Sequence, residues 1–442
     1  MDLEQEQRLK IESTIRQHHQ ALSTLLPEKN TAQINAKEEE CRVQLEKEGL
    51  LTTEVQRELD GMAQRILFSW LQQGNQKISE PELIDICRSY LGEDKLWVEK
   101  FRRYRNLGKA IVLNVLTWQC EMRCSYCSIP KQSGREMSKD ILDLSAELLL
   151  SAPQNRLEMR YFGGEPLLEW EKLKYSIETV WNTQQCSTKC QHKELSFLIT
   201  TNGLKLDLEK IKWMSQFPIS LQIALDGLPE AQNRYRPLYQ SEESSYQYCA
   251  INQAKRLQEY DIPHTVIIVI HPARVEHMLD DFRHIAEQGF EIIQINWAHN
   301  TIWHKKQLEL FAKGLYQLSD YLRDCWARNK GPKLLNLNEQ MKKVRTHQEL
   351  TVDWDGKLYA NNGFLFRPHI AEDLCIGSIY DGRNLLHYSL DYFSAQELDD
   401  ITLSRNVFHN NEQVGQIFNS WIRWMIKQGI PDLSPFISNR YR

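Results

Sequence analysis

The chain has 442 residues, of which 41% are hydrophobic and 26% are charged, and its net charge is −5. The length exceeds that of one ordinary hydrophobic core and predicts two or three domains, and the composition is that of a soluble globular enzyme. The acidic balance excludes a general electrostatic attraction to nucleic acid or to an anionic membrane.

We expect no targeting signal from the opening residues. No apolar run is long enough to span a membrane, and the opening residues Met1-Asp-Leu-Glu-Gln-Glu lack the basic and apolar regions of a signal peptide. We therefore expect a cytoplasmic protein without membrane contact. In that compartment the ten cysteines are expected to be mostly reduced.

Residues 1–107 are expected to form a helical N-terminal region. Apolar residues recur at helical spacing, as in Met62, Ile66 and Trp70, and no catalytic signature is evident. The segment Phe101-Arg-Arg-Tyr-Arg105 alternates aromatic and basic residues, a pattern that can bind nucleic acid. Because no other basic stripe accompanies it, a solvated helix end that leads into the next domain is favoured.

Residues 108–335 contain short β-branched runs separated by helical segments, which predicts a parallel α/β sheet. The six expected strands are 111–116, 157–161, 195–200, 219–225, 265–270 and 291–296. A polar cluster or a histidine follows each of them. Because parallel strands end at the same edge of a sheet, we expect these groups to form one shared active site.

Three cysteines follow the first expected strand in the run Cys120-Glu-Met-Arg-Cys124-Ser-Tyr-Cys127. Thiolates bind soft metals, and a [4Fe–4S] cluster is normally held by four of them. Three at this spacing suggest a cluster with one iron left open as a binding site. A structural zinc site that lacks its fourth ligand, or a group of plain buried thiols, is the alternative.

The C-x3-C-x2-C spacing, with aromatic Tyr126 before the last cysteine, resembles the signature of the radical S-adenosylmethionine (SAM) enzymes. The resemblance implies a partial (β/α)6 barrel over residues 108–335. It also implies that Cys120, Cys124 and Cys127 hold a [4Fe–4S] cluster whose open iron binds SAM. An electron from the cluster then cleaves SAM to a 5′-deoxyadenosyl radical, which takes a hydrogen atom from a substrate carbon.

Several further segments match motifs of that family and imply a set of cofactor-binding residues: Tyr126, Gly163, Gly164, Glu165, Pro166, Asn202, Asp226 and Arg236. Glu165 would accept from the SAM amino group, Arg236 would bind its carboxylate, and Tyr126 and Asn202 would hold the nucleoside. The sequence departs from the family at Ala224, where a serine is usual, and at Gln232-Asn233, where His-Asp is common. Simple turns and a surface charge are the structural alternatives.

Residues 336–442 are expected to form a small C-terminal region closed by a helix at 414–427. The segments 351–362 and 374–381 resemble the start of a SPASM domain, the C-terminal domain that carries auxiliary clusters in part of the family. Asn361 replaces a cluster cysteine, and Asn362 replaces an aspartate that serves as a base. An amide is a poor iron ligand, so a SPASM-like scaffold without auxiliary clusters is predicted.

Two further groups of residues have more than one interpretation. Cys186-Ser-Thr-Lys-Cys190-Gln-His192 has a spacing that could bind zinc, although it precedes the third expected strand, away from the strand ends, and an ordinary pair of reduced thiols is favoured. His271, His299 and His304 could handle protons or could be structural, and no catalytic base is assigned.

The resemblance implies a substrate class as well. Its features are most similar to enzymes that act on peptides or proteins, which predicts modification of a ribosomally synthesised precursor peptide by cross-linking or epimerisation. The expected partners are that peptide and an electron donor such as flavodoxin or ferredoxin. The alternatives are a small-molecule substrate such as a sugar or amino acid, and a binding protein without chemistry. An RNA substrate is disfavoured because no basic surface is expected.

Overall fold

The computed structural model describes residues 40, 42–48, 109–131, 133–152, 154–239, 241–248, 256–299, 301–337, 349–359, 362, 365, 372, 374–381 and 405–427. The chain forms two compact units, Met1–Leu107 and Gly108–Arg442. In the first unit, residues 42–47 are helical and Leu45 is buried. The other predicted helices of residues 1–107 lie outside the described residues, and the three-part division of the chain stays a prediction.

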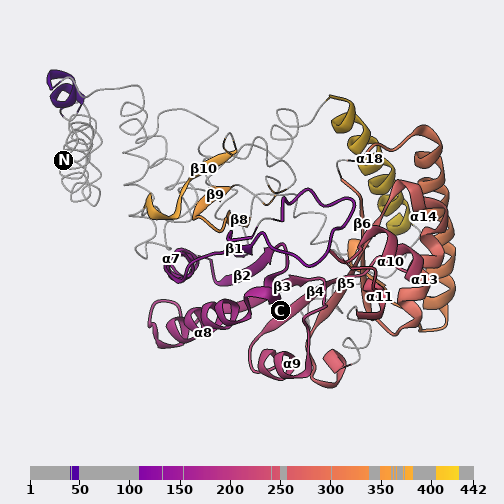
Figure 1. Cartoon of the computed structure of the whole chain (residues 1–442), viewed down its shortest axis with the longest axis horizontal. Coiled ribbons are helices and arrows are strands. Elements are labelled where there is room, and N and C mark those ends of the chain that lie inside the picture. The colour runs from indigo at the N-terminus through magenta and orange to yellow at the C-terminus, as the bar shows by residue number, and fades with distance from the viewer. Residues whose placement is uncertain are drawn as a thin grey trace. The chain divides into compact units, whose positions relative to one another are not determined.

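The described strands of the second unit form a single sheet, with the order β10-β9-β8-β1-β2-β3-β4-β5-β6-β7 (Figure 1). Neighbouring strands from β1 to β7 are parallel, and β8 lies parallel to β1. The strands are β1 (Ala110–Thr117), β2 (Arg156–Gly163), β3 (Glu194–Thr201), β4 (Ile219–Ala224), β5 (His264–Ile270), β6 (Ile292–Trp297), β7 (Lys333–Leu334), β8 (Glu349–Val352), β9 (Lys357–Tyr359) and β10 (Cys375–Ser378). All six strands expected from the sequence are therefore confirmed.

Helices connect the successive parallel strands from β1 to β7. They are α7 (Lys139–Leu150), α8 (Trp170–Cys186), α9 (Leu208–Met214), α10 (Pro229–Tyr235), α11 (Ser245–Tyr248), α13 (Met278–Glu287) and α14 (Lys305–Ala327). A further helix, α18 (Arg405–Lys427), follows the last strand. Short 3-10 helices lie at Pro166–Glu169, Pro272–His277, Leu335–Leu337 and Ile379–Asp381. The alternation of strands and helices confirms the expected α/β class with a parallel sheet.

The two faces of the sheet differ in exposure. Buried and half-exposed residues alternate along β3, β4 and β5. The buried side chains, such as Phe197, Leu221 and Ile268, belong to the main hydrophobic core, where each contributes about 1.5–3 kcal/mol. Side chains on the opposite face, such as Thr200 and Gln222, are half-exposed. That second face is therefore the one open to a ligand.

A network of ion pairs joins β2 to β8 across β1. Arg160 contacts both Glu158 and Glu349 at 2.7 Å, and Lys109 contacts Glu158 at 2.6 Å. Burial alone would raise the pKa of Glu158, but Arg160 and Lys109 together lower it to about 2. The network therefore attaches β8 to the parallel sheet and leaves the charge of Arg160 compensated.

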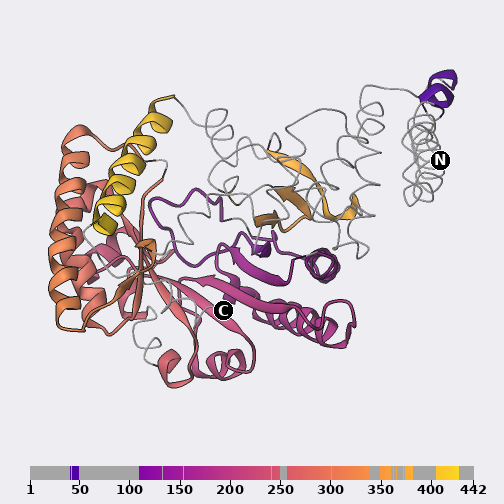
Figure 2. The ribbon, with the colours of Figure 1, turned by 180° about the vertical axis from the view of Figure 1, so that it is seen from behind.

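The C-terminal part of the chain returns to both ends of the sheet. Strands β8 to β10 extend it beyond β1, in a region where the sequence lacks a periodic pattern because each strand has only three or four residues. Helix α18 packs along α14 near β6 (Figure 2), with the indole N–H of Trp421 donating to Ser319 Oγ at 2.7 Å. This helix ends at the predicted Lys427 but begins at Arg405, ahead of the predicted Val414.

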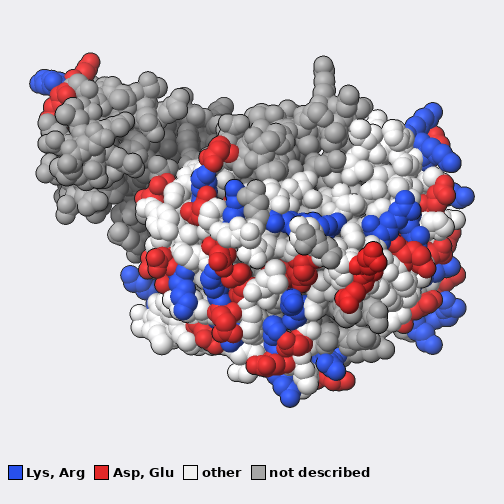
Figure 3. All heavy atoms as spheres, in the orientation of Figure 1, with Lys and Arg blue, Asp and Glu red and all other residues white. Residues whose placement is uncertain are grey.

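On the face shown in Figure 3, acidic and basic side chains of the described residues are interspersed. Several form exposed ion pairs, such as Arg156 with Glu194. None of the described helices is long and apolar enough to cross a membrane.

Candidate active site at the carboxyl ends of the strands

The loop that carries the three cysteines begins directly after β1 and is fastened to the segment after α10. The backbone N–H groups of Arg123 and Ser125 donate to the carbonyl groups of Pro237 and Tyr235 at 2.8 and 2.9 Å. Met122 forms an isolated bridge with Leu238. Residues more than 100 positions apart thus hold the loop in a defined path.

Burial governs the chemistry of these thiols. It raises the pKa of Cys120 to about 12, and it also raises the pKa of Cys124, against the opposing charges of Arg236 and Lys131. All three cysteines have free thiols and are partly exposed. Thiols with a raised pKa stay protonated at neutral pH unless a metal replaces the proton.

Within the described part of the chain, no three His, Cys, Asp or Glu side chains converge on a point where one ion could bind. A single zinc requires such convergence, whereas each cysteine of a [4Fe–4S] cluster binds a different iron.

Gly163 and Gly164 allow the end of β2 to lie directly against the cysteine loop. The Gly164 N–H donates to Thr117 O, and the Glu165 N–H donates to Gln119 O, both at 2.7 Å. A Cβ atom on Gly164 would lie 1.9 Å from Gln119 O. Gly163 has φ = +142°, a conformation that side chains rarely adopt. Both glycines are thus required by close backbone approach.

Glu165 is fully buried and joins β2 to the end of β3. Its carboxylate accepts hydrogen bonds from Leu167 N at 3.0 Å, Thr201 Oγ1 at 2.7 Å and Asn202 N at 2.8 Å. Burial, followed by the charge of Glu121, raises its pKa to about 7. Pro166, also buried, begins the short 3-10 helix that follows. A carboxylate has about four acceptor positions, so one remains for a ligand.

Asn202 lies beside the first cysteine. Its side-chain oxygen accepts from Leu204 N at 2.9 Å, and its side-chain N–H group lies 3.8 Å from Cys120 Sγ. The expected Asn-Gly turn is therefore present, and the Asn202 side chain lies beside the first cysteine of the loop.

Asp226 connects three of the predicted residues. It accepts a 2.6 Å hydrogen bond from the Tyr126 hydroxyl and forms a 3.0 Å ion pair with Arg236. An Arg236 N–H group lies 3.8 Å from Cys124 Sγ. Burial raises the pKa of Tyr126 well above its usual value, so its hydroxyl acts as a donor. Asp226 compensates the charge of Arg236. The predicted contact of Arg236 with the SAM carboxylate would therefore require Asp226 and that carboxylate to share one positive charge.

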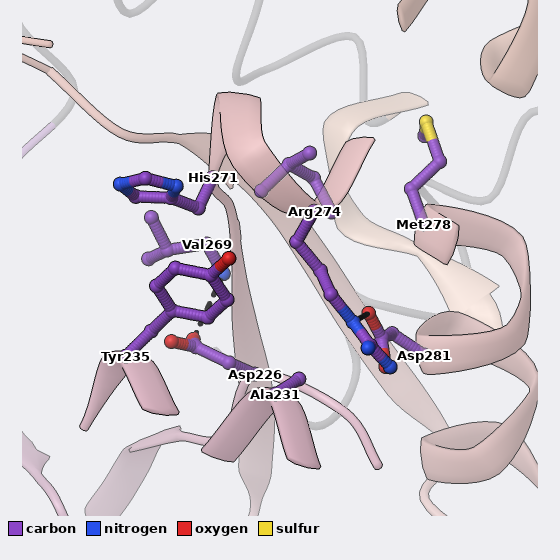
Figure 4. A pocket seen from close by; sticks show the side chains of 9 residues that line it. Asp226, Ala231, Tyr235, Val269, His271, Arg274, Met278 and Asp281 are labelled. Carbon is purple, nitrogen blue, oxygen red and sulfur yellow. Dashed lines mark hydrogen bonds and ion pairs between the residues drawn. The ribbon is translucent and has the colours of Figure 1, made fainter. Parts of the chain in front are cut away.

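A small pocket lies between the ends of β4 and β5 (Figure 4). The Tyr235 ring stacks on His271 with 4.4 Å between centroids, and Arg274 forms a 3.0 Å ion pair with Asp281. Burial lowers the pKa of His271, and its Nδ1 atom accepts from Ala273 N at 3.2 Å. His271 therefore has a structural role as the cap of the following 3-10 helix.

This pocket includes neither of the other two candidate histidines, nor the pair Cys186 and Cys190. His299 follows β6, where its ring lies 5.2 Å from that of Trp297. His304 is exposed, and its backbone N–H group donates to Gln307 Oε1 at 2.8 Å. Cys186 is exposed at the end of α8 and Cys190 is buried; both precede β3, away from the strand ends as expected.

The turn between β8 and β9 contacts the beginning of the cysteine loop. The Trp118 indole N–H donates to Asp353 Oδ1 at 2.9 Å, and Arg135 lies over the rings of both Trp118 and Trp354. Asn362 is half-buried, and Asn361 lies outside the described residues. The C-terminal strands therefore support the cysteine loop directly, a contact that the sequence did not predict.

The buried position of Asp353 predicts that the stability of the fold depends on pH. Burial raises the pKa of Asp353 from 3.8 to about 7, although the hydrogen bond from Trp118 acts in the opposite direction. The folded state favours the protonated acid, so its stabilising contribution is complete below pH 3.8 and is lost as the pH rises through about 7. The total change is at most about 4 kcal/mol.

Asp353→Asn should therefore remove part of this pH dependence, because the amide oxygen can still accept from Trp118 without titrating. The melting temperature of the variant, relative to the wild type, is expected to rise as the pH increases from 4 to 8. Thermal unfolding across that range measures the difference. A difference that stays constant with pH would contradict this account of Asp353.

Two charged residues of the site were missed by the sequence interpretation. Glu121 follows the first cysteine, and its charge acts on both Cys120 and Glu165. Lys131 acts on Cys120 and Cys124. From the sequence alone, a charged residue in a loop is expected to be exposed to solvent. Their position beside the cysteine motif was the one available signal.

Comparison with known proteins agrees with this arrangement. Residues 114–286 match the model of the radical SAM superfamily. The fold is similar to that of native anSMEcpe with bound AdoMet, with a TM-score of 0.56 and 14% identity over 72% of this chain and 99% of that chain. Native anSMEcpe with bound AdoMet and Cp18Cys peptide gives a TM-score of 0.54 and 13% identity, covering 72% of this chain and 99% of that chain. Streptococcus suis SuiB bound to precursor peptide SuiA gives a TM-score of 0.48 and 11% identity, covering 74% and 76%.

The fold and the family match together define the class of protein. The chain carries a radical SAM domain. Residues 114–286 therefore form a domain of the radical SAM superfamily, whose cofactors are a [4Fe–4S] cluster and SAM.

Proposed function

We propose that this enzyme modifies a ribosomally synthesised precursor peptide, by forming a cross-link or by epimerising a residue. The observation that carries the proposal is the similarity of fold to anSMEcpe, which extends over 99% of that chain and includes a complex with AdoMet and the Cp18Cys peptide.

The cofactor pair supplies a carbon-centred radical that removes a hydrogen atom from an unactivated position. In our proposal Cys120, Cys124 and Cys127 hold the cluster. Glu165 and Arg236 bind the amino-acid end of SAM, and Tyr126 and Asn202 hold its nucleoside. The hydrogen bond from Tyr126 to Asp226 and the buried ion pair of Asp226 with Arg236 keep Tyr126 and Arg236 in place. Flavodoxin or ferredoxin is the proposed electron donor.

The open face of the sheet suits an uncharged, hydrogen-bonding substrate. Thr200 Oγ1 donates to Gln222 Oε1 at 2.9 Å, and Gln294 Nε2 donates to Asn296 Oδ1 at 3.1 Å. The charge of Arg160 on β2 is compensated by Glu158 and Glu349. Amide and hydroxyl groups match the donors and acceptors of a peptide backbone better than they match a carboxylate or a phosphate.

The proposal is tested by incubating reconstituted enzyme, SAM and a reductant with candidate peptides encoded beside the gene, followed by mass spectrometry. A cross-link removes a pair of hydrogen atoms, and epimerisation in heavy water adds deuterium to the peptide. A peptide mass unchanged in ordinary and in heavy water, for every candidate, would count against both reactions. Transfer of deuterium from a labelled sugar or amino acid to 5′-deoxyadenosine would instead favour a small-molecule substrate.

A further inference from the structure

The cysteine loop is closed at its base by contacts between Trp118 and Arg135, which lie before and after the three cysteines. The Trp118 backbone N–H donates to Arg135 O at 2.9 Å, and Arg135 Cζ lies 4.6 Å from the centre of the Trp118 ring. A backbone hydrogen bond and a cation–π contact therefore join the two ends of the loop. Any contact that holds Trp118 also holds the rest of the base.

The turn between β8 and β9 holds this base from the C-terminal part of the chain. Trp118 and Asp353 are both buried, and the indole N–H donates to Asp353 Oδ1 at 2.9 Å. Arg135 Cζ also lies 5.6 Å from the ring centre of Trp354. The turn is closed by its own hydrogen bond, from Asp353 N to Lys357 O at 2.9 Å. Two closed segments, distant in sequence, are thus joined by a buried hydrogen bond and a shared guanidinium.

A small hydrophobic core also joins the loop to the C-terminal strands. Its buried members come from β1, from the loop, from β9 and from the segment after β9: Leu113, Val115, Trp118, Ile129, Tyr359 and Leu365. Cys127 packs against this core. Apolar side chains around a metal ligand control the access of solvent to it. The C-terminal strands therefore cover one side of Cys127 in addition to supporting Trp118.

We propose that the turn between β8 and β9 is a latch on the cysteine loop, formed by Trp118, Arg135, Asp353 and Trp354, which retains the cluster in the protein and limits solvent access to Cys127. The hydrogen bond from Trp118 to Asp353 is its main contact, since it reaches the residue two positions before Cys120. Trp118 and Asp353 are thus positioning residues that act through the loop. This role of the C-terminal strands is independent of the nature of the substrate.

Trp118→Phe tests the latch with little change of shape, since it removes the indole donor and keeps an aromatic ring. In anaerobically reconstituted protein, iron should pass to a chelator about ten times faster than in the wild type, as is usual when a contact behind a metal ligand is lost. Asp353→Ala should accelerate the loss of iron equally. Asp353→Asn keeps an acceptor for the indole and should stay close to the wild type. All rates are compared at one pH.

Hydrogen–deuterium exchange of the same samples, read by mass spectrometry, measures the latch itself, whatever metal the loop holds. Peptides from residues 118–137 are compared with peptides from β5, which serve as the internal reference. Exchange in residues 118–137 should be about five- to tenfold faster in Trp118→Phe and in Asp353→Ala, the equivalent of one lost hydrogen bond, and exchange in β5 should not change.

Trp326→Phe is the matched control, because it removes another indole hydrogen bond, from Trp326 to Pro332 O at 2.9 Å near the end of α14. It should leave both iron loss and exchange of the loop unchanged. The double variant Trp118→Phe/Asp353→Ala should behave like either single variant, since both break the same contact. Wild-type iron loss or wild-type exchange in the two single variants would overturn the proposal, as would an equal effect of Trp326→Phe or effects that add in the double variant.

Discussion

Replacing Cys120, Cys124 and Cys127 together with alanine is expected to remove all the iron from the reconstituted enzyme and to abolish cleavage of SAM. The cluster requires thiolate ligands, and alanine supplies none. The wild type should contain about four irons per chain, with an EPR spectrum that SAM alters, and both signals should disappear in the triple variant. Metal and sulfide analysis, together with EPR, measures the effect.

Cys186→Ala is the control for this experiment. Cys186 is an exposed free thiol at the end of α8, so its removal should leave iron content and SAM cleavage unchanged. Iron that survives in the triple variant would mean that other cysteines bind a second cluster, against the prediction of a C-terminal region without auxiliary clusters. A wild type without iron would contradict the assignment of the cysteine loop itself.

Gly164→Ala is expected to have the second largest effect, although glycine and alanine differ by a single methyl group. The added Cβ would lie 1.9 Å from Gln119 O and 2.9 Å from Trp118 C, both backbone atoms that cannot rotate away. The two 2.7 Å hydrogen bonds between the end of β2 and the cysteine loop must then lengthen. We expect the free energy of unfolding to fall by about 2–4 kcal/mol and iron uptake to fall with it.

Gly415→Ala provides a matched comparison within the same chain. A Cβ on Gly415 in α18 would meet Trp297 Cζ2 at 3.8 Å, an ordinary van der Waals distance. Alanine also favours the helix, so the variant should be more stable by about 0.5–1 kcal/mol and should bind iron normally. Thermal unfolding and iron analysis of both variants test the contrast. Wild-type stability and iron content in Gly164→Ala would refute the close approach seen at this position.

Much of the parallel sheet could be predicted from local patterns. The runs that became β1 to β6 are rich in β-branched residues and are separated by segments with helical spacing. Each predicted strand lies within a few residues of the observed one, because burial against helices leaves a periodic signal along the chain. Strands β8 to β10 were missed because three or four residues are too few to show a period.

The candidate site was predictable in its residues and unpredictable in its contacts. The cysteine spacing and the segment Gly163-Gly-Glu-Pro166 identify neighbours in sequence, and the strand order then places them at one edge of the sheet. The pairing of Arg236 with Asp226 and the contact of Asp353 with Trp118 join residues that are distant in sequence. Pairings of that kind depend on side-chain packing between separate loops, for which a single sequence carries no local signal.

The sequence by itself therefore determined the class of fold, the edge of the sheet where the candidate site lies and the thiols available for a cluster, since composition, period and spacing are local properties. Only the tertiary structure decided which charges in the site are compensated. It placed three donors on Glu165 and none of the described donors on Glu121, a difference that arises because burial and hydrogen bonding depend on the loops that surround each carboxylate.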